Sequence, residues 1–299
     1  MGFAWGLDLS VQAVRLCEAT RQGERMQVRR MAEVPLPPGL LQPSVKTPNL
    51  PEPGPLAAAL RQAMADAGCR GYVRVALPDP VFLLRTLSTD ALPPDAGSAR
   101  QFLRWQARDL LPFPAEEARL DYQNAGPGPD GRIRAVCLVA RDRILAEYEG
   151  LLGTVGLRAV TLDARSVAMA QSVSALVTER PSLLLACDGG RATLLVIEAW
   201  RPRVWRILPF PWTANGDGDR LLREIADSLT FFQESEGVGP IERVLVGGLG
   251  ADAATLAERL TAWLEVPAAA VDLAQVAKGW PADADAEWGA ALGAAIRPC

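Results

Sequence analysis

Two aspartates, Asp8 and Asp188, each end the first strand of an expected β-hairpin, and each hairpin opens one half of the chain. Backbone N–H groups in such a turn can surround a phosphate, and the carboxylate can hold a hydrated Mg²⁺. The matched spacing therefore predicts two halves of one phosphate-binding cleft. The hairpins read FAWGLDLSVQAVRLCEA (residues 3–19) and LLLACDGGRATLLVIEA (residues 183–199), and a Glu-Ala pair closes the second strand at the same distance from each aspartate.

The two turns differ in their small residues. The second contains Gly189 and Gly190, which allow a close backbone approach to a ligand, and Thr193 can donate a hydroxyl. The first contains Ser10 and Gln12 and has no glycine. The alternative is that both are ordinary hairpins, in which aspartate and glycine serve only turn geometry.

A third glycine-rich turn, Gly247-Gly248-Leu249-Gly250, follows an expected buried strand and precedes an expected helix. Such a turn can admit an adenosine or a phosphate against the backbone. It is not the GxGxxG pattern, and strand-to-helix turns with glycines are common without any ligand. Alone it is weak evidence for a nucleotide site. It counts for more because it follows the two hairpins, where a third element of such a cleft is expected.

The composition narrows the chemistry. The chain has 299 residues and no histidine, so the usual serine–histidine, cysteine–histidine and zinc hydrolase sites are excluded. A formal net charge of −4 and the lack of a Lys/Arg cluster argue against nucleic acid. No apolar run is long enough to span a membrane, and we expect a cytoplasmic protein. Cys17, Cys137 and Cys187 lie in apolar runs and are expected to be buried free thiols.

The elements that position these turns are predicted from the periodicity of apolar residues and from the prolines and glycines that separate the periodic segments. Before residue 159 we expect a third strand at 26–34, a proline-rich connection at 35–55, a helix at 56–67 and a ββα-ββα unit at 72–158. After it we expect helices at 163–176, 219–232 and 256–264, strands at 203–208 and 243–248, and a closing helix of small residues at 288–297 that can pack closely against another backbone.

Apolar residues in the 102–113 stretch are candidates for a partner-binding groove: Phe102, Trp105, Leu110 and Phe113. The alternative is that they form the core of their own subdomain.

With these elements placed, the sequence resembles the PilM family, actin-like proteins of type IV pilus assembly related to FtsA and to the cytoplasmic half of GspL. The resemblance runs nearly end to end, and the stretches that carry it include WGLDLSVQAVRLCEA, VRVALPDPVFLLRTLSTDALP, FLRWQARDLLPFPAEEARLDYQ and IERVLVGGLGADAATLAERLTAWLEVP. It implies an α/β fold, the duplicated ribonuclease H-like, two-lobed actin-like ATPase fold, with an inserted subdomain called 1C. The implied division is lobe 1 core (1A) at 1–71, subdomain 1C at 72–158, a connection and 1A helix at 159–180, lobe 2 at 181–286 with its 2B part at about 213–240, and a closing helix at 287–299.

The resemblance also implies ATP with Mg²⁺ between the lobes, with Asp8 and Asp188 at the metal through bound water. The implied nucleotide-binding residues are Asp8, Ser10, Gln12, Asp188, Gly189, Gly190, Thr193, Gly247, Gly248 and Gly250. The family's first loop usually reads DIGSSSVK, whereas this chain has Ser10, Val11, Gln12 and Arg15 at the differing positions. These departures predict a degenerate nucleotide site.

The function implied is that of a scaffold at an inner-membrane assembly platform, of a type IV pilus or a related type II secretion machine. Such a protein binds the cytoplasmic N-terminal tail of a PilN-like membrane protein in a groove between subdomains 1A and 1C, and a pilus assembly ATPase is a second implied partner. It would lie in the cytoplasm, peripheral to the inner membrane and without inserting into it. The alternative is an ATP-hydrolysing switch like FtsA; a sugar or acetate kinase on the same fold lacks a recognisable substrate motif here.

Overall fold

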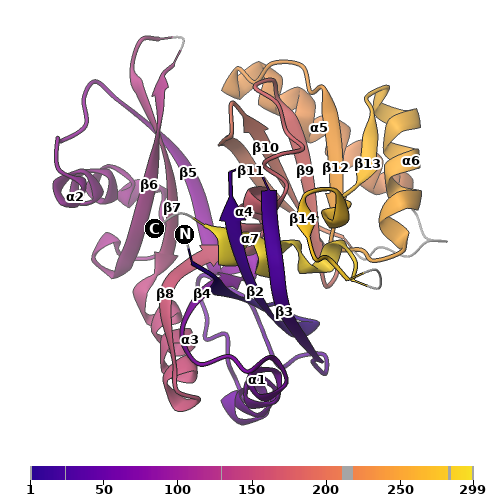
Figure 1. The fold of residues 1–299 in the computed structure, drawn as a ribbon. Coiled ribbons are helices and arrows are strands. Elements are labelled where there is room, and N and C mark those ends of the chain that lie inside the picture. Colours follow the sequence, from indigo (N-terminus) through magenta and orange to yellow (C-terminus); the bar gives the residue numbers. More distant parts are fainter. Residues whose placement is uncertain (1, 24, 129, 211–217, 282–283, 298–299) are drawn as a thin grey trace.

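Two sheets that share one order of five strands, extended in lobe 1 by β14, form the two lobes of the computed structural model (Figure 1). The structure describes residues 2–23, 25–128, 130–210, 218–281 and 284–297. The lobe 1 sheet has the order β14-β3-β2-β1-β4-β8, and the lobe 2 sheet has the order β11-β10-β9-β12-β13. In both, the first strand pairs antiparallel with its hairpin partner and parallel with the next strand inward. The duplication predicted from the two hairpins is therefore confirmed.

The strand bounds are as follows. Lobe 1 contains β1 (Ala4–Leu9), β2 (Ala13–Gln22), β3 (Arg25–Pro35), β4 (Gly71–Leu77), β8 (Leu157–Ala164) and β14 (Ala277–Lys278). Lobe 2 contains β9 (Ser182–Asp188), β10 (Arg191–Glu198), β11 (Arg201–Pro209), β12 (Arg243–Gly247) and β13 (Ala268–Ala270). Strand β9 is an almost continuous buried run, as expected for a strand covered on both faces.

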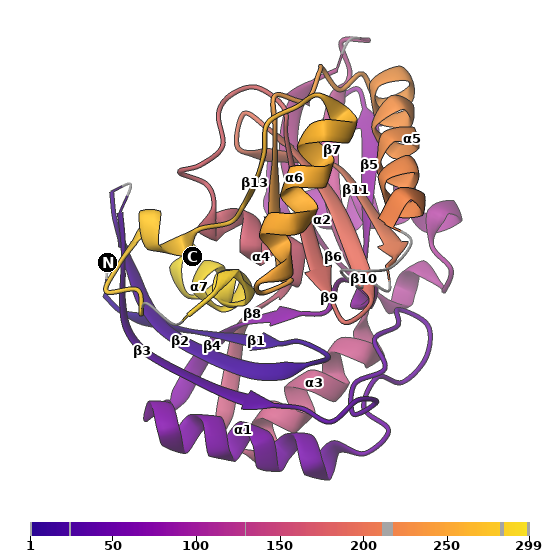
Figure 2. The same ribbon diagram turned by 90° about the vertical axis from the view of Figure 1, so that its right-hand side faces the viewer.

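Helices cover both faces of each sheet (Figure 2). Helices α1 (Pro53–Ala67) and α3 (Asp142–Thr154) share the outer core of lobe 1, and α5 (Gly218–Glu236) and α6 (Asp252–Leu264) share the outer core of lobe 2. Helices α4 (Arg165–Ser172) and α7 (Gly289–Ile296) lie between the lobes, in a core to which both sheets contribute. The inner faces of the sheets are thus joined through two short helices.

Helix α7 consists of small and apolar residues, as predicted, and it packs backbone against backbone. A Cβ on Gly6 of β1 would lie 2.0 Å from the Ala291 carbonyl oxygen, and a Cβ on Gly293 would lie 1.7 Å from the Ala168 carbonyl oxygen. Neither position can accept a side chain without moving a helix. The closing helix therefore fixes α4 against the lobe 1 sheet.

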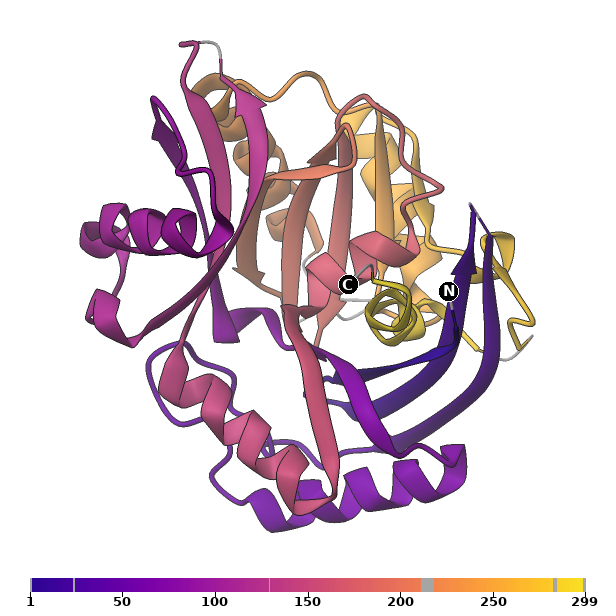
Figure 3. The same cartoon turned by 60° about the vertical axis from the view of Figure 1, so that its left-hand side comes forward.

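A three-stranded sheet of order β5-β7-β6 forms the inserted subdomain, which stands beside lobe 2 (Figure 3). It comprises β5 (Phe82–Thr89), β6 (Ala118–Pro127), β7 (Ile133–Arg141) and α2 (Ala96–Gln106). The sequence assigned β4 and α3 to this unit, and that assignment was wrong. Strand β4 pairs with β1 and β8, and α3 buries Tyr148 in the lobe 1 core, because both elements carry apolar residues that the small inserted sheet cannot cover.

Other expected bounds also shift. The helix expected at 163–176 begins only at Arg165, because β8 keeps its pairing with β4 as far as Ala164. The Glu18-Ala19 pair does not close β2, which continues to Gln22, whereas Glu198 does end β10. The expected 2B boundary near 213 lies outside the described residues.

Cys17, Cys137 and Cys187 are buried free thiols, as predicted. Among the described residues, no helix is long and apolar enough to cross a membrane.

Candidate functional site

The turn of the first hairpin is closed onto itself by Ser10. Its hydroxyl oxygen accepts hydrogen bonds from the backbone N–H groups of Gln12 (3.1 Å) and Ala13 (3.0 Å), and the hydroxyl donates to the Ala13 carbonyl (3.2 Å). Ser10 is fully buried. The N–H groups of Gln12 and Ala13, which could face a phosphate at this turn, are therefore bonded within the turn.

Asp8 is fully buried, and its carboxylate is held by a cation from another element. The Nε of Arg165, in the first turn of α4, donates to both carboxylate oxygens of Asp8, at 3.1 and 3.2 Å. A second guanidinium, that of Arg15, lies 3.8 Å from the same carboxylate. Arg15 also pairs with Glu33 at 2.9 Å and with Glu287. Asp8 thus has two arginines where the sequence predicted a hydrated metal ion.

The second hairpin has a different turn. Gly189 and Gly190 form a two-residue connection with φ values of 51° and 84°, which favour glycine. The Val11 side chain of the first turn lies against it, because a Cβ on Gly189 would be 2.1 Å from Val11 Cγ2. The two predicted phosphate turns are therefore in direct contact with each other.

Asp188 lies at the end of β9 beside this turn. Its buried Oδ1 has no hydrogen-bond partner among the described residues. Burial raises the pKa of Asp188 to about 6, against the opposing effect of the Arg165 charge. Asp188 is thus a carboxylate that is only partly compensated by its surroundings.

Thr193 of β10 hydrogen-bonds Asp79, which lies in a 3₁₀ turn (Asp79–Val81) after β4. Asp79 also accepts the backbone N–H of Ser166 at 2.9 Å, which caps the start of α4. Burial raises the pKa of Asp79. The hydroxyl that the sequence assigned to a phosphate is therefore engaged in a contact between β10 and the β4–β5 connection.

The third turn is occupied by packing contacts. A Cβ on Gly247 would lie 2.8 Å from the Met169 sulfur, and a Cβ on Gly248 would lie 2.1 Å from the Cys187 carbonyl oxygen. Gly248 and Gly250 have φ values of 85° and 52°. Backbone proximity and left-handed conformation account for these glycines without a ligand.

Two small cavities lie around these turns among the described residues. The cavity between Gln12, Gly189 and Gly248 measures about 250 Å³, below the roughly 300–1,000 Å³ usual for ligand pockets. A second cavity, beside Val11 and Arg165, measures about 10 Å³. The larger cavity is lined by Asp188, Asp252 and Glu287 and by the single basic residue Arg191, so its charge opposes a phosphate chain.

Sequence reasoning missed Arg165 and Asp79. The available signal for Arg165 was a lone arginine in the apolar LDARSVAMA stretch, at a strand-to-helix junction. The signal for Asp79 was an acidic residue between two prolines, where a solvated turn was the simpler interpretation. Only the tertiary structure brings both residues to the two hairpins.

The residues predicted for a partner groove separate into two groups. Phe113 is buried in the core of the inserted subdomain, and Phe102 packs against that core. Trp105 and Leu110 are exposed, at 59% and 49% of their surfaces, and the Arg108 guanidinium lies 4.7 Å from the Trp105 ring centroid. The four residues therefore do not line one groove.

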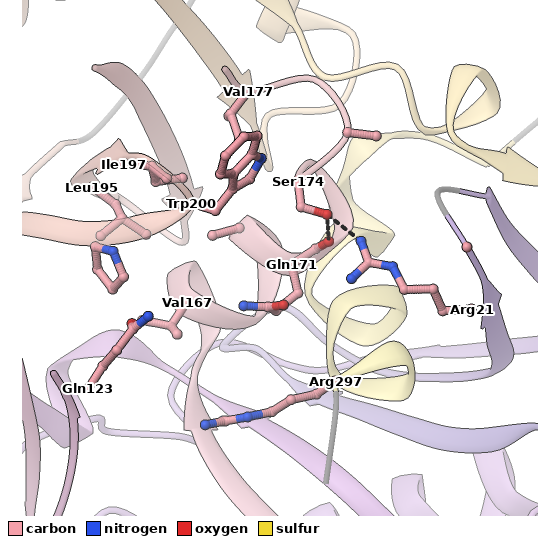
Figure 4. Close-up of a pocket in the computed structure, with 14 residues that line it drawn as sticks. Arg21, Gln123, Val167, Gln171, Ser174, Val177, Leu195, Ile197, Trp200 and Arg297 are labelled. Carbon is pink, nitrogen blue, oxygen red and sulfur yellow. Dashed lines mark hydrogen bonds between the residues drawn. The ribbon is translucent and has the colours of Figure 1, made fainter. Parts of the chain in front are cut away.

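A larger cavity, of about 650 Å³, lies where lobe 1, the inserted sheet and lobe 2 meet (Figure 4). Helix α4 forms its floor with Val167 and Gln171, β6 contributes Gln123, and the β10–β11 turn contributes Trp200. Trp200 is 53% exposed and has a φ of 57°.

The polar part of this cavity carries two arginines, Arg21 and Arg297. Arg21 donates to the Ser174 hydroxyl, while its buried Nε has no hydrogen-bond partner among the described residues. The cavity thus combines apolar walls with the polar side chains of two arginines and two glutamines.

Comparisons with known proteins place this geometry in a family. The family model described as type IV pilus assembly protein PilM matches residues 6–188. A chain in the solved structure of a PilM–PilN type IV pilus biogenesis complex is 24% identical, with a TM-score of 0.83 and 99% of both chains covered.

More distant structures share the fold. The ethanolamine utilization protein EutJ from Carboxydothermus hydrogenoformans is 12% identical, with a TM-score of 0.53 over 99% of this chain and 90% of that one. A Bacteroides thetaiotaomicron protein of unknown function with an actin-like ATPase fold is 8% identical, with a TM-score of 0.50 over 92% of each chain. The fold of this chain is therefore the two-lobed actin-like fold.

Proposed function

Because this chain belongs to the family of type IV pilus assembly protein PilM, we propose that it is an actin-like scaffold that binds the cytoplasmic N-terminal tail of a PilN-like membrane protein. The observation that carries the proposal is the 650 Å³ cavity beside the inserted sheet, in a fold shared with the PilM chain of a PilM–PilN complex. The scaffold would lie in the cytoplasm and be held at the inner-membrane assembly platform through that tail.

The lining of the cavity supports an extended peptide as its ligand. Trp200 and Val167 offer apolar surface on opposite sides, and Gln123 and Gln171 offer side-chain amides to a peptide backbone. We place subdomain 1C at residues 78–141 in this proposal, rather than 72–158, because β4 and α3 are part of lobe 1. The cavity then lies where 1A, 1C and lobe 2 meet.

Tail binding is proposed to need no nucleotide. Three contacts support this: Ser10 accepts from the N–H groups of Gln12 and Ala13, Arg165 pairs with Asp8, and Val11 lies against Gly189 of the second hairpin. This supports the degenerate nucleotide site predicted from the departures in the first loop. If partner binding required Mg-ATP, that result would favour the alternative, an ATP-hydrolysing switch like FtsA.

Three exposed tryptophans allow a matched test. We expect Trp200→Asn to weaken binding of a synthetic tail peptide of the cognate PilN-like protein by about tenfold or more, as for a buried aromatic anchor. Asparagine tolerates the left-handed conformation of position 200, so the turn is preserved. Isothermal titration calorimetry would measure the dissociation constants.

The same substitution at Trp263, 46% exposed on α6, is the control and should leave binding unchanged. Trp105→Asn tests the other predicted surface on the inserted subdomain. Loss of binding in Trp105→Asn with full binding in Trp200→Asn would move the site to that outer surface. Absence of binding by the unaltered protein, with and without nucleotide, would refute the proposed function.

A further inference from the structure

Arg165 connects three segments that are far apart in the sequence. Its Nε donates to the Asp8 carboxylate of lobe 1, and one terminal nitrogen donates to the Cys187 carbonyl of lobe 2 at 2.8 Å. The other terminal nitrogen donates to the Glu287 carbonyl, just before α7, at 3.3 Å. The side chain is nearly inaccessible, with 3% of the residue exposed. One guanidinium thus joins lobe 1, lobe 2 and the closing segment.

The position of Arg165 is not explained by its own helix. It is the first residue of α4, where the helix dipole favours negative rather than positive charge. Asp79 supplies that negative charge, since it caps the helix through Ser166. The guanidinium is therefore held by the carboxylates and carbonyls that face it and not by a local preference.

The surroundings of Arg165 are acidic. Asp8, Asp79 and Asp188 all lie close enough to favour its charged form electrostatically. Arg15 is the nearby second cation, and it is shared with Glu33 and Glu287. A buried group of carboxylates of this kind requires a cation, because ionised carboxylates lose their hydration on burial.

We infer that the Arg165 guanidinium is a built-in replacement for a bound cation between the two hairpins, which holds the lobes closed without metal or nucleotide. The inference rests on the proposed nucleotide-independent scaffold and gives it a mechanism. An exchangeable cation lets a cleft open when it leaves, whereas a cation attached to α4 stays in place. The closed cleft is then a permanent feature of the protein.

Chemical rescue tests this inference. Arg165→Ala removes the cation and leaves a space of guanidinium size beside Asp8, so we expect the midpoint of thermal unfolding in EDTA to fall by about 10 °C. Millimolar methylguanidinium chloride should restore several degrees, because a ligand that binds only the folded state stabilises it. Magnesium chloride without EDTA is the second probe, and tetramethylammonium chloride controls for ionic strength.

Arg119→Ala is the matched control. Arg119 also pairs with two carboxylates, Asp142 and Glu149, but at the surface, so its loss should lower the midpoint by no more than about 2 °C. Neither cation should raise the midpoint of this variant or of the unaltered protein. An Arg165→Ala midpoint within about 2 °C of the unaltered protein, or a large loss that neither cation restores, would overturn the inference.

If Arg165→Ala does not fold, a pair of substitutions that removes both charges provides a second test. We expect Arg165→Met combined with Asp8→Asn to unfold at a higher temperature than Arg165→Met alone, because the uncompensated carboxylate is removed with its partner. A double variant that is less stable than both single variants would contradict the inference. Tail-peptide binding is measured separately on the unaltered protein, so failure of the proposed function and failure of this inference give different results.

Discussion

The two hairpins carry the same aspartate-to-glutamate spacing but place their turns differently. Asp8 pairs across its hairpin with Arg15, so several residues form the connection beyond it, whereas Asp188 pairs directly with Arg191 across the two glycines. In the first hairpin, Ser10 closes the turn and two arginines hold the aspartate. In the second hairpin, the turn is short and the aspartate keeps an unpartnered oxygen.

The difference shows that turns at equivalent places in the two halves of a duplicated fold can differ in local structure. The first turn places the Val11 side chain against the second turn. The second turn retains the glycines but meets the Val11 side chain where a phosphate was expected. Matched spacing thus reports common architecture, whereas the residues inside each turn decide whether a ligand can enter.

Adding a side chain where the two turns touch should lower the free energy of unfolding most. We expect Gly189→Ala to cost about 4 kcal/mol of unfolding free energy, because the new Cβ combines a left-handed conformation with a clash against Val11. Gly190→Ala is the control, since it has a similar conformation but its nearest neighbour is the Phe210 carbonyl oxygen at 3.8 Å; it should cost about 1 kcal/mol.

Urea denaturation would measure both variants. Adding Val11→Ala to Gly189→Ala should recover part of the loss, because the clash partner is removed. Equal costs for the two glycine variants, or additive effects of Val11→Ala and Gly189→Ala, would show that the two turns do not press on each other.

The aspartate of the second hairpin should give the protein a distinctive pH dependence. With a pKa of about 6 when folded against 3.8 when unfolded, Asp188 makes the folded state bind more protons between these values. The free energy of unfolding should therefore fall as pH rises through this window, by up to about 3 kcal/mol from this group.

Asp188→Asn should remove that contribution, so the difference in unfolding free energy between the two proteins should change steadily from pH 4 to pH 6. Urea titrations at several pH values would measure it. Parallel pH profiles for the unaltered protein and the variant would show that Asp188 ionises as freely in the folded chain as in the unfolded one.

The closed first turn should give a smaller effect. Ser10→Ala leaves the part-buried N–H group of Gln12 and the buried N–H group of Ala13 without their acceptor, and we expect a loss of about 2 kcal/mol. Ser44 makes the same kind of turn, accepting from the N–H groups of Lys46 and Thr47, but these groups are exposed. Ser44→Ala should therefore cost less than about 0.5 kcal/mol, and a Ser10→Ala cost in that range would contradict the account of the first turn.

Much of the architecture could be predicted from the sequence, because strands and helices follow apolar periodicity and the two hairpins repeat. The small residues of 288–297 correctly indicated a helix in close backbone contact. The site could not be predicted to the same extent. Nothing near Asp8 in the sequence indicates Arg165, which reaches it only because β8 continues to Ala164 and starts α4 in the cleft.

The inserted subdomain shows the same limit. Strand β4 looks like the start of a new unit, since it follows a glycine and precedes another strand, yet its parallel pairing with β1 is a long-range choice. Likewise, Phe113 and Trp105 lie close together in the sequence, but one is in a core and the other is exposed. Local pattern does not distinguish these outcomes, because burial depends on elements that the chain supplies later.

We propose that the protein binds its partner tail without nucleotide, while Arg165 holds the two lobes together. The most direct measurement is calorimetric titration of the unaltered protein with the tail peptide of the cognate PilN-like protein, in EDTA and again in saturating Mg-ATP. We predict one binding site with dissociation constants that agree within about twofold, since a ligand that does not bind cannot shift an equilibrium. Binding seen only with Mg-ATP, or strengthened more than about tenfold by it, would contradict the claim.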